Sequence, residues 1–283
     1  MILRQALQRA SEVLTSHDIE DAPLEAELLL RHALRMSRTG LYAELGQEFP
    51  PDKTETFWQL IGRRLAHEPT AYIMERREFF GLDLHVDHRV LIPRPESELL
   101  VEQAIELARR PPGSPRRLIA DIGTGSGAIA ISLALNLPQS KIYATDASAA
   151  ALEVAAVNCE RHKVADRVWL LQGDMLAPLP QPVDLIVANL PYIEEGALGQ
   201  LSAEIRWFEP MSALAGGADG LESIGRLLAQ AGGKLRPQGC LVLEVGSGQA
   251  EAVTSLAKSH FPHARVRLAP DLSGMGRAVI VEV

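Results

Sequence analysis

The second half of the chain alternates between short apolar runs and helical segments, and this pattern limits the possible folds more than any other feature. The apolar runs are typical of buried strands and lie at 117–123, 141–146, 167–174, 183–192 and 240–246. The helical segments that separate several of them lie at 128–137, 150–163 and 220–239. Strands that alternate with helices predict an α/β fold, in which a parallel sheet is covered on both faces.

The chain ends differently, with two β-like runs and no helix between them. Residues 264–270 and 276–283 are separated only by the stretch Asp-Leu-Ser-Gly-Met. A connection this short permits a hairpin, so we expect an antiparallel strand at the end of the sheet.

The first 70 residues carry a different pattern, with apolar residues every three or four positions. This spacing predicts helices at 2–14 and 23–36, and a third after the segment Pro-Pro-Asp-Lys-Thr-Glu. Phe57, Leu60, Ile61 and Leu65 should form the buried side of that third helix. We therefore expect a small helical bundle at the N-terminus.

A short β-like region follows, and then a helix. The stretch 78–93 alternates around Gly-Leu-Asp at 81–83, which predicts a hairpin. Two prolines precede a helix within 92–110, and 109–117 has the composition of a linker or exposed loop. The expected domains are a helical domain at 1–72, a β-hairpin connector at 73–93 and an α/β domain at 94–283.

Composition excludes several classes of protein. With 47% hydrophobic and 23% charged residues the chain is globular, and its net charge of −8 disfavours free nucleic acid as a partner. Four arginines, at 63, 64, 76 and 77, form either a local basic patch or a solvated helix face. Two distant cysteines predict a reduced protein without a cysteine-based metal site.

The sequence also lacks the features of a secreted or membrane protein. The first residues mix charged and apolar side chains, unlike a secretory signal. No stretch approaches the roughly 20 apolar residues that a membrane helix needs. We expect a cytoplasmic, monomeric protein that binds no metal and no membrane.

The first chemical motif is Ala-Asp-Ile-Gly-Thr-Gly-Ser-Gly at 120–127. Gly123, Gly125 and Gly127 follow a predicted strand and open a helix, as in a βα turn that binds a cofactor. The spacing is G-x-G-x-G and differs from the G-x-G-x-x-G of dinucleotide-binding folds. Any tight βα turn could also use such glycines. The predicted cofactor contacts here are Asp121, Gly123, Thr124, Gly125, Ser126 and Gly127.

Acidic residues end the next two predicted strands. Asp146, followed by Ala147, stands where a carboxylate can accept both hydroxyls of a ribose, although it could instead cap the following helix. Asp174 and Met175 end the next strand, where they suit contact with a purine base. The alternative is a loop-initiating aspartate beside a core methionine.

The strand at 183–192 delivers Asn189, Leu190, Pro191 and Tyr192 to its own carboxyl end. Turn chemistry alone could explain an asparagine and a proline there. Alternatively, the amide and the ring lie over a bound substrate, with Asn189 also near the cofactor.

Taken together, these motifs carry a family resemblance. The series Asp-Ile-Gly-Thr-Gly-Ser-Gly, Ala-Thr-Asp, Gln-Gly-Asp-Met and Asn-Leu-Pro-Tyr resembles the Rossmann-like class I S-adenosylmethionine methyltransferases. Adding Arg-Glu-Phe-Phe-Gly, Leu-Ile-Pro-Arg-Pro-Glu-Ser-Glu and Arg-Trp-Phe-Glu-Pro-Met-Ser-Ala-Leu, the chain is similar to the peptide chain release factor glutamine N5-methyltransferases (PrmC/HemK family). This resemblance covers nearly the whole chain.

The resemblance implies methyl transfer to the side-chain amide of the Gly-Gly-Gln glutamine of a translation release factor. It places the glycine turn at the methionine part of S-adenosylmethionine, Asp146 at the ribose and Met175 near the adenine, with S-adenosylhomocysteine as the product. Asn189 and Tyr192 would face the glutamine. The N-terminal bundle would recognise the rest of the release factor.

Two further stretches suggest residues on the substrate side. Arg94, from the Pro-Arg-Pro segment, and Glu209, from Phe-Glu-Pro, could shape that side, and Phe80 could line its entrance. The prolines could equally stiffen a linker, Glu209 could be an ordinary ion-pair partner, and phenylalanines of this kind more often belong to the core.

One position departs from the family pattern. Leu190 stands where the N-P-P-Y motif has its first proline. The family uses the backbone carbonyl there as an acceptor for the substrate nitrogen, and leucine supplies the same carbonyl without the fixed φ of proline. Three alternatives stay open: a ribosomal-protein glutamine N5-methyltransferase, a nucleic-acid adenine N6-methyltransferase, and a cofactor-binding scaffold without activity.

Overall fold

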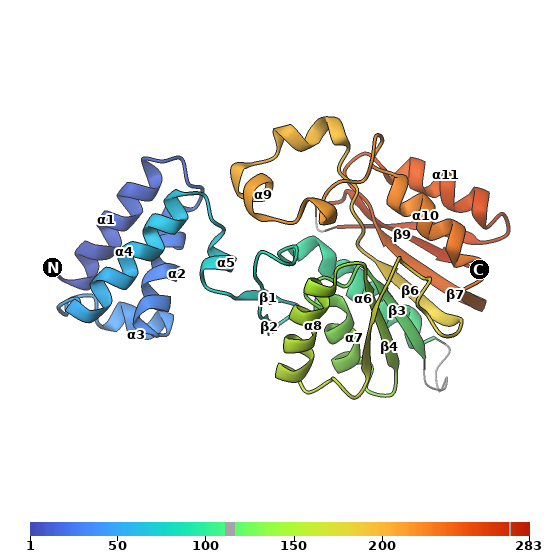
Figure 1. The fold of residues 1–283 in the computed structure, drawn as a ribbon, viewed down its shortest axis with the longest axis horizontal. Helices are drawn as coiled ribbons and strands as arrows, with labels where there is room; N and C mark the ends of the chain where they lie inside the picture. The colour runs from blue at the N-terminus through green and yellow to red at the C-terminus, as the bar shows by residue number, and fades with distance from the viewer. Residues whose placement is uncertain (111–116, 272) are drawn as a thin grey trace. The chain divides into compact units, whose positions relative to one another are not determined.

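The computed structural model describes residues 1–110, 117–271 and 273–283, which form two compact units (Figure 1). The first unit contains Met1–Arg76 together with Ser202–Phe208, and the second contains Arg77–Leu201 and Glu209–Val283. The first unit thus includes a segment from late in the sequence. Most of the loop predicted at 109–117 lies outside the described residues.

The first unit is a helical bundle, as the periodicity predicts. Prolines in the first turns of the second and fourth helices suit those positions, because their missing N–H has no partner within the helix anyway. Leu14, Leu29, Phe57 and Ile61 are fully buried between the helices, whereas Leu65 is only partly buried. The helices are α1 (Leu3–Thr15), α2 (Ala22–Leu34), α3 (Arg38–Ala43), α4 (Pro51–Leu65), α5 (Thr70–Ile73) and the late α9 (Ala203–Phe208).

Arg64 on α4 does not belong to a solvated helix face, as one interpretation of the sequence had it. Its side chain is 3% exposed and forms ion pairs with Glu25, at 3.1 Å, and with Glu204 of α9. Glu25 also accepts a hydrogen bond from Thr70. Burial raises the pKa of Glu25, and Arg64 opposes that rise. The buried Arg64 side chain therefore links α4 to Glu25 of α2 and to Glu204 of α9 within the first unit.

The second unit begins with a small hairpin of β1 (Arg77–Phe79) and β2 (Leu82–Leu84). Phe79 pairs with Leu82, so the turn consists of Phe80 and Gly81, with φ values of 52° and 72°. The sequence interpretation placed the turn at 81–83 and was wrong by one residue. Two successive positive φ values give the strand twist that two-residue hairpins need.

A seven-stranded sheet forms the centre of the second unit, with the order β5-β4-β3-β6-β7-β9-β8. Of the seven strands, β9 alone runs against the direction shared by the other six, so the mostly parallel α/β architecture predicted from the sequence is confirmed. The strands are β3 (Leu118–Ile122), β4 (Lys141–Asp146), β5 (Val168–Gln172), β6 (Val183–Ala188), β7 (Leu235–Glu244), β8 (Arg265–Pro270) and β9 (Gly276–Glu282).

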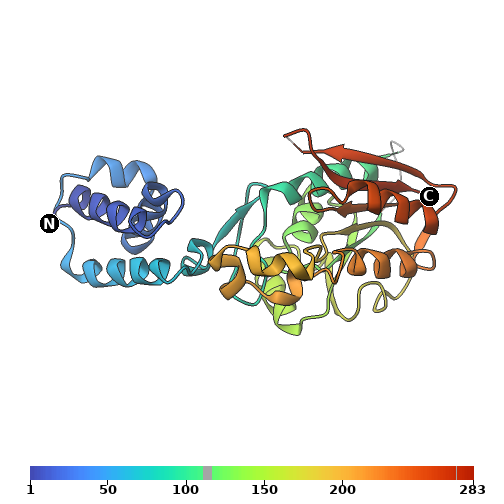
Figure 2. The ribbon, with the colours of Figure 1, turned by 90° about the horizontal axis from the view of Figure 1, so that it is seen from above.

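The C-terminal hairpin is present, but its antiparallel strand does not lie at the end of the sheet. β9 is inserted between β7 and β8, and β8 forms the edge. The red C-terminal strands lie along one side of the second unit in Figure 2. β7 also begins at Leu235, five residues before the predicted Cys240. Its pairing with β6 is interrupted between Val183 and Leu185, and this irregularity accommodates Pro237 within the strand.

Helices cover both faces of this sheet (Figure 1). Alternate residues of each strand face opposite layers, so Ile119 packs in one core and Ala120 in the other. One layer contains α6 (Glu98–Ala108), α7 (Ala128–Asn136) and α8 (Ala149–Arg161), and the other contains α10 (Glu222–Ala231) and α11 (Ala250–His260). Short 3-10 turns occur at η1 (Pro95–Ser97), η2 (Glu195–Gln200) and η3 (Met211–Ala213).

Length and hydropathy together decide whether a helix can cross a bilayer. Among the described residues, no helix combines the length and the hydropathy that spanning a bilayer requires.

Candidate active site

A cavity of about 270 Å³ opens at the carboxyl ends of the central strands of the second unit. The strand order reverses direction around β3, and open α/β sheets bind ligands at such switch points. Nine of the residues predicted from the sequence line this cavity: Gly123, Gly125, Asp146, Ala147, Asp174, Met175, Asn189, Leu190 and Pro191.

The glycine turn brings backbone rather than side chains to the cavity wall. Gly123 has a φ of +73°, and a Cβ atom there would lie 3.3 Å from the Cδ2 of Leu190. A larger residue would therefore be strained and would press on the Asn-Leu-Pro-Tyr segment. Glycine at this position lets β3 and β6 end close together.

The other predicted residues of this turn shape it from behind and do not line the cavity. Asp121 is 1% exposed and accepts hydrogen bonds from Thr124 Oγ1 at 2.6 Å and from the Ala130 N–H at 3.1 Å. Burial raises the pKa of Asp121 to about 7. The Ser126 carbonyl accepts a hydrogen bond from Asn158, and Gly127 caps the start of α7.

Asp146 ends β4 and lies on the cavity wall. Its two carboxylate oxygens accept hydrogen bonds from the backbone N–H groups of Gly125 and Ser148, each at 2.9 Å. Ser148, and not Asp146, is the N-cap of α8, since its side chain accepts from the Ala151 N–H. The capping interpretation of Asp146 was therefore wrong. Each carboxylate oxygen keeps a second lone pair for a ligand.

Asp174 and Met175 lie where β5 ends and also line the cavity. Asp174 pairs with Arg226 at 2.6 Å and accepts a hydrogen bond from Gln230 at 3.3 Å. Met175 packs against the core with a φ of 49°. The cavity thus combines a polar rim with an apolar wall on this side.

Asn189 has a fixed side-chain orientation. Its Nδ2 donates a hydrogen bond to Ser97 Oγ at 2.9 Å, and Ser97 in turn donates to Glu244 Oε2 at 2.6 Å. The amide oxygen of Asn189 is then the polar atom that the side chain can offer to a ligand in the cavity. Neither Ser97 nor Glu244 was singled out from the sequence. Ser97 lies in the quoted stretch 91–98, but no local pattern marks its contact with Asn189.

Tyr192 lies behind the cavity wall and does not line the cavity. Its hydroxyl group hydrogen-bonds to Glu244, and its backbone oxygen accepts from Gln249 Nε2 at 2.9 Å. Burial raises the pKa of Tyr192 to about 12, so the phenol stays protonated at neutral pH. In this structure the ring anchors the segment that carries Asn189.

The predicted substrate-side residues lie outside the cavity wall. Arg94 and Glu209, 115 positions apart in the sequence, form a 2.5 Å ion pair in which the Glu209 side chain is 2% exposed. This pair joins the segments that precede Pro95 and Pro210. Phe80 packs against the core, and its backbone N–H donates to Glu98 at 2.9 Å.

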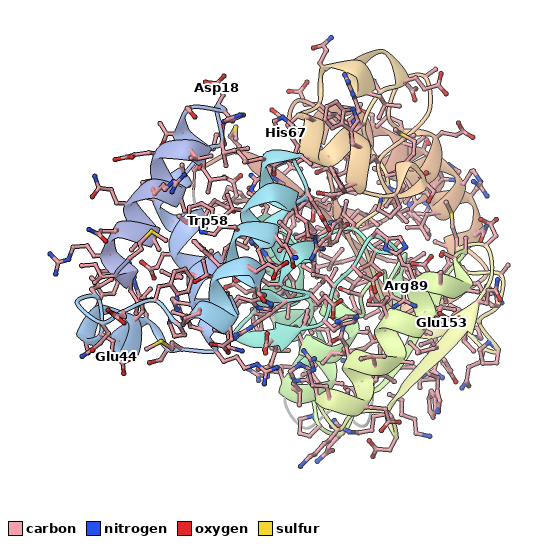
Figure 3. The ribbon with its side chains drawn as sticks, turned by 60° about the vertical axis from the view of Figure 1, so that its left-hand side comes forward. Asp18, Glu44, Trp58, His67, Arg89 and Glu153 are labelled. Carbon is pink, nitrogen blue, oxygen red and sulfur yellow. The ribbon has the colours of Figure 1, made fainter. Side chains whose placement is uncertain are left out.

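Arg89 is a cavity residue that the sequence did not single out. Asp87 and Glu153 hold its guanidinium, with nitrogen–oxygen distances of 2.6 and 2.9 Å. Figure 3 labels Arg89 and Glu153, which lie close to each other. Hydrogen bonds from Arg89 lower the pKa of Asp87 to about 2. The remaining cavity residues were not predicted as site residues, although several lie within the quoted motifs: Val90, Leu91, Ile122, Thr145, Ser148, Ala151, Gly173, Pro210, Ser212, Ala213, Ser223 and Arg226.

These residues fit a nucleoside-containing cofactor. Asp146 offers carboxylate oxygens of the kind that accept ribose hydroxyls, and Gly123 and Gly125 permit close backbone approach. Asp121 Oδ1 is buried, and within the described residues it has no hydrogen-bond partner. The cavity volume lies close to the range of about 300–1,000 Å³ common for small-molecule sites.

Both the N-terminal helical region and the α/β region match known protein families. Residues 5–74 match the family described as PrmC N-terminal domain, and residues 96–207 match the family described as Methyltransferase small domain. A solved methyltransferase from Pyrococcus furiosus shares the fold, with a TM-score of 0.53 and 20% identity. That similarity covers 72% of this chain and 89% of the other.

Two relatives of similar length carry the same name. A release factor glutamine methyltransferase of Moorella thermoacetica is 46% identical, over 99% of this chain and 98% of the relative. The protein of the same name from Bacillus anthracis is 34% identical, over 100% of both chains. The chain belongs to the release factor glutamine methyltransferase family.

Proposed function

We propose that this chain transfers a methyl group from S-adenosylmethionine to the side-chain amide nitrogen of a glutamine in a peptide chain release factor. The names of the full-length relatives support this substrate. The observation that carries the chemistry is Asn189, which lines the cavity with its Nδ2 already bonded to Ser97. Its Oδ1 can therefore accept a hydrogen bond from a substrate N–H.

The cofactor would occupy the cavity along the carboxyl ends of the strands. Asp146 would accept the ribose hydroxyls, and Asp174 and Met175 would lie beside the adenine. The backbone of Gly123 and Gly125 would line the methionine part. When bound, S-adenosylmethionine supplies a methyl group on a positively charged sulfur.

The protein residues act mainly by orienting a poor nucleophile. A carboxamide nitrogen is weakly nucleophilic because its lone pair is delocalised into the carbonyl. Asn189 Oδ1 and the Leu190 carbonyl would each accept one N–H, which directs the lone pair toward the methyl carbon. Orientation of this kind can contribute about 7–11 kcal/mol in well-ordered sites.

Methyl transfer of this kind does not need a strong base in the site. The amide nitrogen forms a bond to the methyl carbon, and the pair of the breaking carbon–sulfur bond stays on sulfur. The nitrogen loses its proton to water after alkylation, when that proton is more acidic. Pro191 stiffens the acceptor segment, and Tyr192 holds it through Gln249 and Glu244.

The helical domain would supply recognition of the partner protein. We assign residues 1–72 to binding the release factor outside its Gly-Gly-Gln loop, 73–93 to a connector and 94–283 to catalysis by a monomer. The Arg94–Glu209 ion pair would shape the substrate side next to Pro210, which lines the cavity. Phe80 would support that side through the hairpin.

A substrate panel tests the proposed function. The chain would be incubated with methyl-labelled S-adenosylmethionine and, separately, with purified release factors, ribosomal proteins and DNA. We expect label in release factors only. Label in a ribosomal protein or in adenine would contradict the substrate class. Absence of label in every sample, despite measurable binding of S-adenosylmethionine, would contradict the proposed activity.

A further inference from the structure

Ser97 and Glu244 form a buried connection behind Asn189. Ser97 is 4% exposed and Glu244 is 2% exposed. Ser97 comes from η1, whereas Glu244 ends β7, 147 residues later. The strand register explains why Glu244 lies near Asn189, because Ala188 pairs with Leu243 and the next residues are Asn189 and Glu244. Ser97 reaches the same place from η1 and bonds both side chains. Three separate segments therefore converge on one amide group.

The hydrogen bonds of this connection have a defined direction. A serine hydroxyl has one proton, and Ser97 donates it to Glu244 over 2.6 Å. Ser97 can then only accept from Asn189, which presents Nδ2 at 2.9 Å. Burial raises the pKa of Glu244, whereas its hydrogen bonds with Ser97 and Tyr192 and the positive charge of Arg277 favour the ionised carboxylate. An acceptor-only carboxylate thereby sets the orientation of an amide that it does not touch.

The orientation matters because the two ends of the Asn189 side-chain amide differ in hydrogen bonding: Nδ2 donates and Oδ1 accepts. If the Asn189 amide were rotated by half a turn, its NH₂ would face the substrate NH₂, and two donors would oppose each other. With Nδ2 on Ser97, the acceptor Oδ1 faces the substrate instead. A rotated amide would cost both the substrate bond and the bond to Ser97.

We propose that Ser97 and Glu244 are positioning residues that hold Asn189 with its Oδ1 toward the reacting amide nitrogen. This inference rests on the proposed function. Neither residue lines the cavity, so each acts through Asn189 and touches neither substrate nor cofactor. By orienting Asn189, they keep its Oδ1 beside the Leu190 carbonyl, so that both oxygens can accept hydrogen bonds from the substrate nitrogen.

Steady-state kinetics of three variants tests the proposal. Glu244→Gln offers Ser97 a donor and frees its hydroxyl to bond Asn189 Oδ1, and Ser97→Ala removes the link altogether. Both should lower kcat about 10-fold to 100-fold. The KM for the release factor and the Kd for S-adenosylmethionine should change by less than about threefold. The contacts that bind the ground state and the transition state equally well are left in place by these substitutions. Ser97→Thr keeps the hydroxyl and should restore most of the rate.

A double variant and a matched control separate positioning from general damage. In Ser97→Ala/Glu244→Gln, kcat should fall no further than in Ser97→Ala alone, because the second residue acts only through the first. Ser132→Ala removes another fully buried hydroxyl, one that bonds the Ala128 carbonyl within α7. It should leave kcat unchanged. Unchanged kcat in Ser97→Ala and Glu244→Gln, or losses that multiply in the double variant, would overturn the proposal.

Nuclear magnetic resonance provides a readout that does not depend on the substrate. The Asn189 side-chain NH₂ signals would be identified by their loss in Asn189→Asp, and their shift should change in both Ser97→Ala and Glu244→Gln but not in Ser132→Ala. Signals that do not move would overturn the proposal even if the chain methylated another substrate. If the wild-type chain transferred no methyl group but the signals moved, the proposed function would fail while the orientation of Asn189 would stand.

Discussion

The side-chain nitrogen of Asn189 donates a 2.9 Å hydrogen bond to the hydroxyl of Ser97, 92 residues away in the sequence. This contact decides which end of the Asn189 amide is left for the cavity. It also links the Pro-Arg-Pro-Glu-Ser segment to the Asn-Leu-Pro-Tyr segment. Two motifs that look independent in the sequence therefore serve one acceptor site.

Removing the Asn189 amide should impair catalysis more than binding. Asn189→Ala deletes one of the two acceptors for the substrate nitrogen, so kcat should fall about 100-fold or more, as when one oriented hydrogen-bonding group is lost from an active site. Affinity for S-adenosylmethionine, measured by calorimetry, should fall much less, because Asp146 and the glycine turn remain. Full activity in this variant would exclude the proposed role of Asn189.

Leu190 should matter for stability through its side chain and for catalysis through its backbone. The side chain is 6% exposed and packs in the core beside Gly123. Leu190→Ala should lower the free energy of unfolding by about 2–4 kcal/mol, as for other buried leucines. Because the carbonyl persists, kcat below the unfolding temperature should stay within a few-fold of the wild type. Urea denaturation and initial rates measure the two effects, and a loss of kcat comparable to that of Asn189→Ala would contradict this assignment.

A methyl group at Gly123 should damage both the fold and the cofactor site. Gly123→Ala forces an L-residue to a φ of +73° and brings its Cβ to 3.3 Å from Leu190. We expect a loss of about 1–2 kcal/mol in unfolding free energy and weaker binding of S-adenosylmethionine.

Gly62→Ala is the matched control for that substitution. Gly62 lies in α4 with no atom within 4 Å of the added Cβ. This control should instead stabilise the protein by up to about 1 kcal/mol, without changing cofactor affinity. Equal effects of the two substitutions, by calorimetry and thermal melting, would show that the turn does not require glycine at position 123.

The Asp87–Arg89 pair should make stability depend on pH in the acid range. The pKa of Asp87 falls from 3.8 to about 2 in the folded protein, so between these values the unfolded state binds more protons. The stabilisation, about 1 kcal/mol once solvent screening of this partly exposed pair is allowed for, is present above pH 3.8 and is lost as the pH falls toward 2. Asp87→Asn should remove it at neutral pH, and the difference from the wild type should shrink on acidification. Urea denaturation across this range tests the prediction, and a pH-independent difference would contradict it.

The sequence was sufficient for the architecture because hydrophobic periodicity reports which residues are buried. It predicted the strands from Leu118 onward and the amphipathic helices at the N-terminus. It missed the placement of β9 between β7 and β8, since strand order depends on packing between distant segments. It also misplaced the start of β7, where a local irregularity tolerates Pro237.

Site residues could be predicted from the sequence where they form a recognisable motif of neighbouring residues. The glycine turn and Asp146 stand next to strand ends, and the structure brings them to one cavity. No local pattern marks the roles of Ser97 and Glu244. Glu244 approaches Asn189 only when β6 and β7 pair, and Ser97, although it lies in the quoted stretch 91–98, meets them only through the tertiary fold. Arg89 was missed for a similar reason, as its partner Glu153 lies on α8.

The most direct test of the account is mass-spectrometric mapping of a release factor after reaction with this chain and S-adenosylmethionine. We expect one added methyl group, located on the side-chain nitrogen of the Gly-Gly-Gln glutamine, and its near absence with the Asn189→Ala variant under equal cofactor saturation. A methyl group on any other residue, or undiminished methylation by Asn189→Ala, would contradict it.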